Sequence, residues 1–325
     1  MSLLKTRKVQ DFYYYTEKKE INMVTVPYRG IEPVENLVVK TIMEKGRVLY
    51  VTGETKESAL ISLRLKELEL DYIYEKEDFD FGIHLINFNE GIKIKKEYDL
   101  LVYDDVNSFP EHTKLEAQNL VGYLYNKCTK TVAYSIEPIF NETEVIEIPL
   151  KGRSGFITEP RVIETRVNIH EAVPNFIYDY LLWFISENRK ILYITQNNEN
   201  KNNIIEFLLS INEKYEDIIV DIDNMDMDEI KRYAYTEEKP YIFIASTIRE
   251  LLDIKVNFEI ILAGADSEKY DYRKLIFLAL RTGFINDING ELLLLCKTPS
   301  LDVKKAQDIS RYYNRVIWDS EFGSD

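Results

Sequence analysis

The feature that most constrains the fold of this chain is a regular alternation of short apolar runs with segments whose apolar residues recur at helical spacing. Apolar runs of about 4–8 residues bounded by turn residues are typical of strands that are buried on both faces of a parallel sheet. Strands that alternate with helices favour βαβ units, in which helices flank a mostly parallel sheet. Because the pattern occurs in each half of the chain, we predict two α/β domains in tandem.

The expected elements follow directly from this pattern. In the first half, strands are expected at 47–52, 71–74, 81–88, 99–104, 130–134 and 144–148, and helices at 34–45, 58–68 and 112–127. In the second half, strands are expected at 190–195, 217–221, 241–245, 258–262 and 291–295, and helices at 172–187, 200–211, 227–235, 273–282 and 302–314.

A stretch rich in turn residues separates the two halves. Gly152, Gly155 and Pro160 interrupt the periodic segments there, which is typical of a linker. The expected organisation is therefore an N-terminal segment at 1–33, a first domain at 34–150, a linker at 151–165 and a second domain at 166–325.

The composition is that of a globular protein of the cytoplasm. Hydrophobic residues make up 45% of the chain and charged residues 30%. No apolar run approaches the roughly 20 residues that span a bilayer, so no membrane span is expected. The two cysteines, Cys128 and Cys296, exclude a disulfide framework and a Cys-rich zinc site, and they fit a reducing compartment.

The charge of the chain bears on nucleic-acid binding. A net charge of −15 argues against tight nonspecific binding, although a local basic groove stays open. The N-terminal segment interleaves basic and aromatic residues, a composition that suits single-stranded nucleic acid. The alternative is an arm that packs its tyrosines on the domain. The residues concerned are Lys5, Arg7, Lys8, Phe12, Tyr13, Tyr14, Tyr15, Lys18 and Lys19.

A pair of carboxylates, Asp104 and Asp105, directly follows the expected strand at 99–104. Acids at this point project from the carboxyl edge of a parallel sheet, where open α/β folds bind ligands. In nucleotide hydrolases one such acid holds Mg²⁺ and another residue positions water. The alternative is an ordinary turn that follows a buried strand.

The stretch 47–68 has the layout of a phosphate-binding loop. A strand is followed by a turn with Gly53 and Lys56 and then by a helix. The GxxxxGK[ST] motif itself is not intact, because Thr55 precedes the lysine and Glu57 follows it.

Several stretches, taken in order between about 34 and 314, carry a family resemblance. They are VTG with Lys56, DLLVYDDVNSFP at 99–110, YSIEP at 134–138, STIRELL at 246–252, FEIILAGAD at 258–266 and LIFLALRTGF at 275–284. Together they resemble the ComFA family, the superfamily 2 DEAD/DEAH-like helicase ATPases of the DNA-uptake machinery.

The resemblance implies a fold and a set of roles. It implies two tandem RecA-like domains with mostly parallel sheets flanked by helices, the first of them shortened. It implies ATP and Mg²⁺ as cofactors and single-stranded nucleic acid as a partner. The implied nucleotide-binding residues are Gly53, Thr55, Lys56 and Glu57, the metal ligand is Asp104, and the catalytic residues are Asp105 and Arg281.

The departures from the family pattern reduce the expected chemistry. Thr55 replaces a glycine of the phosphate loop, and Glu57 stands where a hydroxyl would bind Mg²⁺. Asp105 is one methylene shorter than the glutamate that orients water, and Phe284 replaces a second arginine finger. We therefore expect a degenerate helicase-like protein, a pseudoenzyme that associates with nucleic acid and has weak or absent ATP hydrolysis.

Two alternatives stay open. One is a non-catalytic interaction protein that retains the helicase architecture as a scaffold for a protein partner. The other is an active ATP-dependent DNA translocase that uses Glu57 as a metal ligand.

Overall fold

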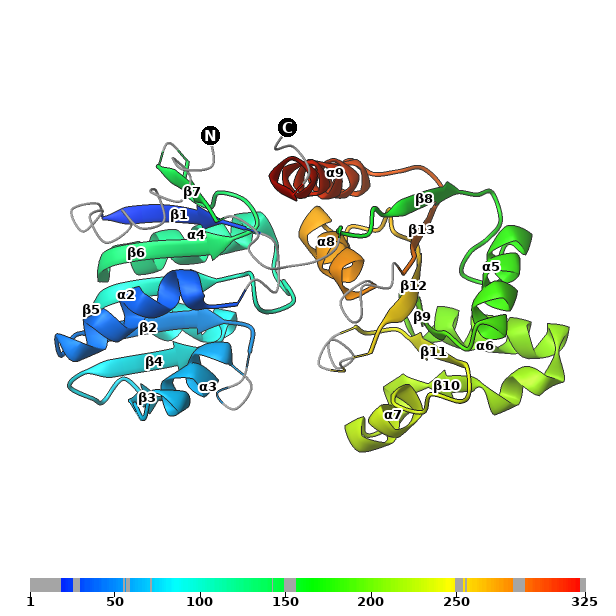
Figure 1. The fold of residues 1–325 in the computed structure, drawn as a ribbon, viewed down its shortest axis with the longest axis horizontal. Helices are drawn as coiled ribbons and strands as arrows, with labels where there is room; N and C mark the ends of the chain where they lie inside the picture. The colour runs from blue at the N-terminus through cyan, green and yellow to red at the C-terminus, as the bar shows by residue number, and fades with distance from the viewer. Residues whose placement is uncertain are drawn as a thin grey trace. The chain divides into compact units, whose positions relative to one another are not determined.

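The computed structural model describes residues 19–25, 30–54, 56, 59–70, 72–141, 143–148, 156–248, 254, 256–282 and 290–321. The chain divides into two compact units, Met1–Arg153 and Ser154–Asp325. Each unit is a parallel sheet flanked by helices (Figure 1), as the alternating sequence pattern predicts. None of the helices formed by the described residues is both long enough and apolar enough to cross a membrane.

The first unit contains a seven-stranded sheet with the order β3-β4-β2-β5-β6-β1-β7, in which all neighbouring strands are parallel. Its strands are β1 (Glu20–Val24), β2 (Arg47–Thr52), β3 (Ile73–Tyr74), β4 (Gly82–Ile86), β5 (Tyr98–Asp104), β6 (Cys128–Ser135) and β7 (Val145–Glu147). Its helices are α2 (Glu32–Met43), α3 (Leu60–Glu67) and α4 (Lys114–Tyr125), together with the short 3-10 helix η2 (Phe88–Lys93).

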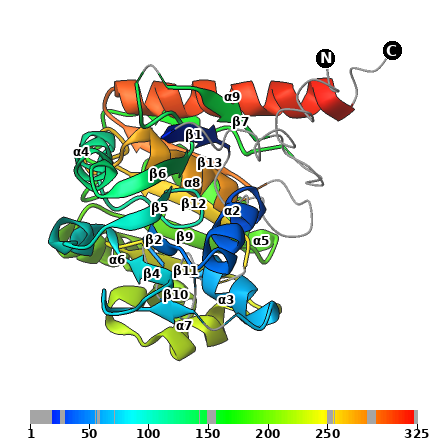
Figure 2. The same ribbon diagram turned by 90° about the vertical axis from the view of Figure 1, so that its left-hand side faces the viewer.

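The helices of this unit cover opposite faces of the sheet, with α2 and α3 on one side and α4 on the other (Figure 2). Successive residues of the central strands therefore enter different cores. Tyr50 and Val102 pack with α2 and α3, whereas Val51 and Leu101 pack with α4. Burial on both faces explains why these strands are continuous apolar runs in the sequence.

Strand β1 lies within the stretch expected as an N-terminal segment at 1–33. It pairs in parallel with β6 and β7. A polar residue, Asn22, interrupts its apolar run, yet Asn22 is fully buried because its side chain bonds the backbone of Ile139 and Phe140. The basic and aromatic residues at 5–18 lie outside the described residues.

The second unit contains a six-stranded parallel sheet with the order β10-β11-β9-β12-β13-β8. Its strands are β8 (Arg161–Glu164), β9 (Lys190–Ile194), β10 (Ile219–Asp221), β11 (Tyr241–Ala245), β12 (Phe258–Ala263) and β13 (Leu292–Cys296). Its helices are α5 (Asn175–Ser186), α6 (Asn198–Ile211), α7 (Met227–Ala234), α8 (Tyr272–Arg281) and α9 (Leu301–Glu321), with η3 (Glu213–Asp217) and η4 (Ile222–Asn224) as short 3-10 helices.

Strand β8 lies inside the stretch expected as a linker at 151–165. It pairs with β13 at the edge of the second sheet, and its residues are only partly buried or exposed. A four-residue edge strand that begins with arginine and ends with glutamate has no continuous apolar run, so periodicity alone does not reveal it.

Candidate functional site

The candidate site of the first unit lies at the carboxyl ends of β2 and β5. These strands are neighbours, and Thr52 at the end of β2 is in register with Asp104 at the end of β5. The loops that follow the two strands therefore start side by side. One loop carries the glycine and lysine of the predicted phosphate loop, and the other carries the two predicted carboxylates.

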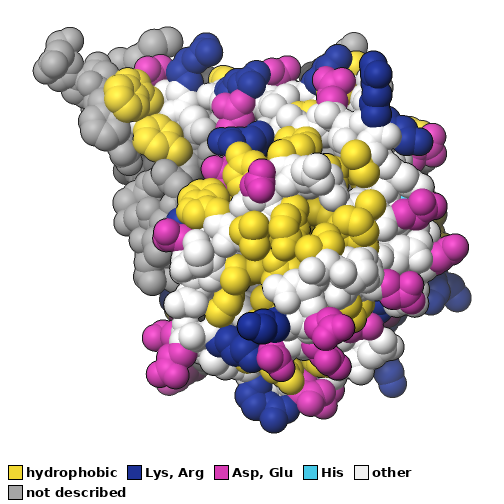
Figure 3. All heavy atoms as spheres, turned by 90° about the vertical axis from the view of Figure 1, so that its right-hand side faces the viewer, with side chains coloured by type: hydrophobic (Ala, Val, Ile, Leu, Met, Phe, Trp, Pro, Cys, Tyr) yellow, Lys and Arg dark blue, Asp and Glu magenta, His cyan; other side chains and the backbone are white. Residues whose placement is uncertain are grey.

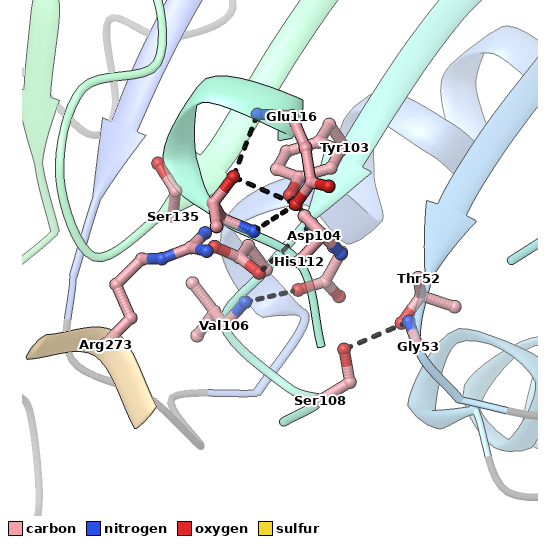
Figure 4. Close-up of polar contacts among 12 residues, drawn as sticks. Thr52, Gly53, Tyr103, Asp104, Val106, Ser108, His112, Glu116, Ser135 and Arg273 are labelled. Carbon is pink, nitrogen blue, oxygen red and sulfur yellow. Dashed lines mark hydrogen bonds and ion pairs between the residues drawn. The ribbon is translucent and has the colours of Figure 1, made fainter. Parts of the chain in front are cut away.

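Asp104 is buried, and both of its carboxylate oxygens are occupied by donors of its own unit. Oδ2 accepts hydrogen bonds from the Tyr50 hydroxyl at 2.6 Å and from the Asn107 amide at 2.9 Å. Oδ1 accepts hydrogen bonds from the backbone N–H of Val106 at 3.0 Å, which Figure 4 shows, and from that of Asn107 at 3.2 Å. A carboxylate offers about four lone-pair positions, so these four donors use the full capacity of Asp104.

The ionisation of this site follows from its burial. Burial raises the pKa of the Asp104 carboxyl above its ordinary value, although the hydrogen bonds from Tyr50 and Asn107 oppose the rise. Burial and the adjacent Asp104 raise the pKa of Tyr50 well above its ordinary value. Tyr50 therefore stays a neutral donor, and Asp104 acts as the acceptor around which the next loop folds.

Asn107 connects this loop to the segment that precedes α2. Its side-chain oxygen accepts from the N–H of Gly30 at 3.1 Å, and its amide donates to the carbonyl of Gly30 at 3.2 Å. The Tyr134 hydroxyl also donates to that carbonyl, at 2.9 Å. Gly30 has a φ of 94°, a conformation that favours glycine. The DDVNS sequence thus connects the end of β5 by hydrogen bonds to β2 and to the segment that precedes α2.

Ser108 closes the start of the predicted phosphate loop. Its hydroxyl accepts a hydrogen bond from the backbone N–H of Gly53 at 3.0 Å (Figure 4). A Cβ atom at position 53 would lie 2.8 Å from Ser108 Oγ, so glycine is needed for this close approach. In a phosphate loop, backbone N–H groups of this kind face the nucleotide. Here the N–H of Gly53 is used within the unit.

Glu54 supplies a carboxylate to the first turn of α3. Its Oε2 accepts a hydrogen bond from the N–H of Leu60 at 3.2 Å. The N-terminus of a helix attracts anions because its first N–H groups lack partners and the helix dipole is positive there. A bound phosphate would use the same donors. Glu54 thus supplies an acceptor within the unit to one of these donors, the N–H of Leu60.

Lys56 lies on the surface beside Glu75, the residue that follows β3. Its Nζ is 4.0 Å from Glu75 Oε1, and the two side chains are 38% and 66% exposed. Such an exposed pair contributes little to stability, so Lys56 is held only weakly. Thr55 and Glu57, the other predicted residues of the phosphate loop, lie outside the described residues.

Asp105, the predicted water-positioning residue, is buried next to His112. Its backbone N–H donates to the carbonyl of Tyr134, and its Oδ1 lies 4.0 Å from His112 Nε2. The imidazole stacks on Phe88 with ring centroids 3.6 Å apart, and it bonds the hydroxyl of Tyr103. These contacts fix the imidazole beside Asp105.

Arg281, the predicted arginine finger, belongs to the second unit and is anchored there. It ends α8, is buried, and donates a hydrogen bond to the carbonyl of Ile254. Phe284, at the position of a second finger, lies outside the described residues.

A second polar cluster, which sequence reasoning missed, lies at the carboxyl ends of β10 and β11. Lys201 of α6 is buried and forms ion pairs with Asp221 at 2.6 Å and Asp223 at 3.1 Å. Asp223 also accepts from the backbone N–H and the hydroxyl of Ser246, at 3.0 and 2.7 Å. One sequence signal was available: Lys201 falls on the same helical stripe as Ile204 and Leu208, so a partner for its charge was required.

Among the described residues of the first unit, the groups expected to meet Mg·ATP form hydrogen bonds within the unit instead. The lone pairs of Asp104 are used, the N–H of Gly53 is bonded to Ser108, and the N-terminus of α3 carries Glu54. In the part of the chain that the structure describes, no group of three or more His, Cys, Asp or Glu side chains is arranged to hold a metal ion. The arrangement is that of a sheet edge whose described polar groups are hydrogen-bonded within the unit.

Comparisons with known proteins identify the fold. No family model matches this sequence, and no curated protein matches it. Among solved structures, the chain is similar to Dbp5 of S. cerevisiae in a structure titled as bound to RNA and ADP BeF3. The two are 10% identical, with 92% of this chain and 84% of that chain covered and a TM-score of 0.50. This likeness confirms the predicted fold class, two tandem RecA-like domains with parallel sheets flanked by helices.

Proposed function

We propose that this chain is a degenerate superfamily 2 helicase-like protein of the ComFA type, which binds single-stranded nucleic acid and hydrolyses ATP weakly or not at all. The observation that carries the loss of hydrolysis is the occupation of the nucleotide-binding edge by the chain's own side chains. Ser108 and Glu54 take the N–H groups that would receive phosphates, and four internal donors saturate Asp104.

A nucleotide could bind at this sheet edge only if the hydrogen bonds of Ser108, Glu54 and Asp104 were all broken together. Each net hydrogen bond contributes roughly 0.5–1.5 kcal/mol, and bonds to charged groups contribute about 1.5–3 kcal/mol. The hydrogen bond from Arg281 to the carbonyl of Ile254 would also have to break before Arg281 could reach a bound nucleotide. An arginine finger that reaches the phosphates increases the rate of hydrolysis about 10³–10⁵-fold. These contacts favour a chain that no longer binds and hydrolyses ATP in a catalytic cycle.

Association with nucleic acid is proposed because the fold is shared with a protein whose structure was determined with RNA. The net charge of −15 requires the contact to be local, through a limited set of basic residues. The segment at 5–19, with its interleaved Lys, Arg, Tyr and Phe, has a composition suited to that role.

A thermal-shift titration tests the nucleotide proposal. We expect no change in the melting curve with Mg·ATP up to millimolar concentration. A ligand present at about 100 times its Kd would add about 2.7 kcal/mol and raise Tm by about 5–10 °C in units of this size. The matched control is Lys56→Ala. A shift in the wild-type chain that disappears in this variant would contradict the proposal and favour the ATP-dependent translocase.

Fluorescence anisotropy with labelled single-stranded oligonucleotides tests the nucleic-acid proposal. We expect binding at about 50 mM salt that weakens steeply as salt rises, with a log–log slope of about −0.7 for each phosphate contacted. Neutralising Lys5, Arg7 and Lys8 is expected to reduce that slope, whereas Lys214→Gln should leave it unchanged. Absence of binding at the lowest salt concentration would favour the second candidate, a scaffold protein, which the internal saturation of the sheet edge also supports.

A further inference from the structure

Helix α5 exposes three large apolar side chains to solvent. Asp179 is its sole charged residue, and its inner side chains Ile177, Leu181 and Phe184 enter the core of the second unit. On the outer side, Phe176 is 39%, Leu182 44% and Trp183 41% exposed. Exposed apolar areas of this kind mark interaction sites in monomeric proteins.

This apolar area is continuous on the side of the molecule where α5 and α6 lie. Figure 3 views that side and shows one broad hydrophobic area with charged side chains around it. Partly buried residues of α6 extend the apolar surface beside α5, and Ile211 at the end of α6 is 44% exposed. We use the term α5 face for the surface formed by Phe176, Tyr180, Leu182 and Trp183.

Two arginines hold the aromatic rings of the α5 face in place. The guanidinium of Arg189 lies 4.9 Å from the centroid of the Trp183 ring, and that of Arg161 lies 5.8 Å from the Tyr180 ring and donates to its hydroxyl. Arg189 is fixed in turn by an ion pair with Glu259 at 2.8 Å. Rings that are already ordered lose little conformational entropy on binding, and Trp, Tyr and Arg dominate binding energy at interfaces.

The stretch of chain that carries the α5 face has an excess of exposed acidic residues, although Arg161, whose side chain is 53% exposed, also lies beside the face. Between residues 171 and 217, all of which the structure describes, Lys214 is the exposed basic residue, while Lys190 and Lys201 are buried and Arg189 is half-buried. The exposed acidic residues of the same stretch are Glu171, Asp179, Glu187, Glu199, Glu206, Glu213, Glu216 and Asp217. A partner that covers the apolar area must therefore complement this excess of negative charge along residues 171–217.

We propose that the α5 face binds a basic amphipathic segment of another protein, with bulky apolar side chains on one side and Lys or Arg along its flanks. A second copy of this chain is disfavoured as the occupant, because each copy carries a net charge of −15. Nucleic acid and anionic lipid are disfavoured by the same excess of negative charge. The proposal concerns a surface separate from the β2–β5 edge and does not depend on nucleotide or nucleic-acid binding.

Selection from a displayed library of random 16-residue peptides on the immobilised full-length chain tests this proposal. The enriched peptides are expected to carry a net positive charge and to have Leu, Phe, Ile or Trp at helical spacing. An enriched peptide, synthesised with a fluorophore, should bind Trp183→Ala about 30-fold more weakly than wild type, the change that corresponds to a hot-spot loss of about 2 kcal/mol. Its affinity should also fall as salt rises.

Two further variants keep the test decisive. Leu182→Lys changes an exposed residue and adds a repelling charge, so it should weaken binding even if Trp183→Ala alters local packing. Leu115→Ala, at a residue of α4 that is 65% exposed in the first unit, should bind like wild type. The proposal is overturned if no peptide is enriched, if enriched peptides are neutral or acidic, or if Leu182→Lys binds them as tightly as wild type. A wild-type dimer in sedimentation that Leu182→Lys converts to monomer would assign the face to a second copy.

Discussion

Replacement of Asp104 by alanine is expected to lower the free energy of unfolding of the first unit by about 3–5 kcal/mol. The substitution leaves four buried donors without their acceptor: the Tyr50 hydroxyl, the Asn107 amide and two backbone N–H groups. Each unsatisfied buried donor costs about 1–3 kcal/mol, and partial relaxation keeps the total below their sum.

The two tryptophans allow this loss to be assigned to one unit. Trp183 and Trp318 both belong to the second unit, so their fluorescence reports its unfolding, whereas far-ultraviolet circular dichroism reports both units. In urea titrations, Asp104→Ala should move part of the circular-dichroism transition to lower urea and leave the fluorescence transition in place. The control is Asp78→Ala, which removes a fully exposed acid of the same unit and should change stability by less than about 0.5 kcal/mol.

The same measurement separates a structural Asp104 from a metal ligand. A carboxylate kept for a metal is a buried charge without compensation in the metal-free chain, and removing it should stabilise that chain. Asp104→Ala that is as stable as wild type, or more stable, would therefore contradict the structural role. That result would favour the metal-binding role that the family resemblance implies for Asp104.

Much of the fold was predictable because the central strands are buried on both faces. Strand β2 has the predicted bounds, and β5 differs from its prediction by a single residue, since an apolar run has the same length as the buried strand. Strands β1 and β8 were not predicted. The first carries Asn22 at its centre and the second is a short exposed edge, so their positions depend on partners distant in sequence.

The sequence predicted that the ends of β2 and β5 lie side by side, but it did not predict the hydrogen bonds formed there. The sequence places Asp104 and Asp105 at the end of β5 and a glycine directly after β2, and parallel strands bring those ends together. It did not indicate that Ser108 would bond Gly53 or that Glu54 would reach Leu60. Such contacts depend on loop geometry within a few ångströms, whereas a motif records residue types and spacing alone.

Replacement of Lys201 by methionine is expected to lower the stability of the second unit by about 3–5 kcal/mol, the usual cost of removing one partner from a buried ion pair. The change leaves Asp221 and Asp223 facing each other without the ammonium group that lies 2.6 and 3.1 Å from them. The tryptophan-fluorescence transition should therefore move to lower urea, the reverse of the pattern for Asp104→Ala. Lys214→Met, at an exposed lysine of the same unit, should leave that transition unchanged.

The pH dependence of stability, compared between wild type and Lys201→Met, gives a second test of this ion-pair cluster. Burial alone would lower the pKa of Lys201, but hydrogen bonds from Lys201 to Asp221 and Asp223 outweigh it and raise that pKa above 10.5. Burial alone would raise the pKa of Asp223, but hydrogen bonds from Ser246 and Lys201 hold it below 3.8. A lysine whose pKa is raised by folding stabilises the fold at lower pH, and this stabilisation is lost as the pH rises through that pKa. An aspartate whose pKa is lowered by folding stabilises the fold at higher pH, and this stabilisation is lost as the pH falls through that pKa. The stability difference between wild type and Lys201→Met should therefore be constant between about pH 5 and 9 and shrink outside that range. A difference that varies strongly around neutral pH would show that another titrating group controls the cluster.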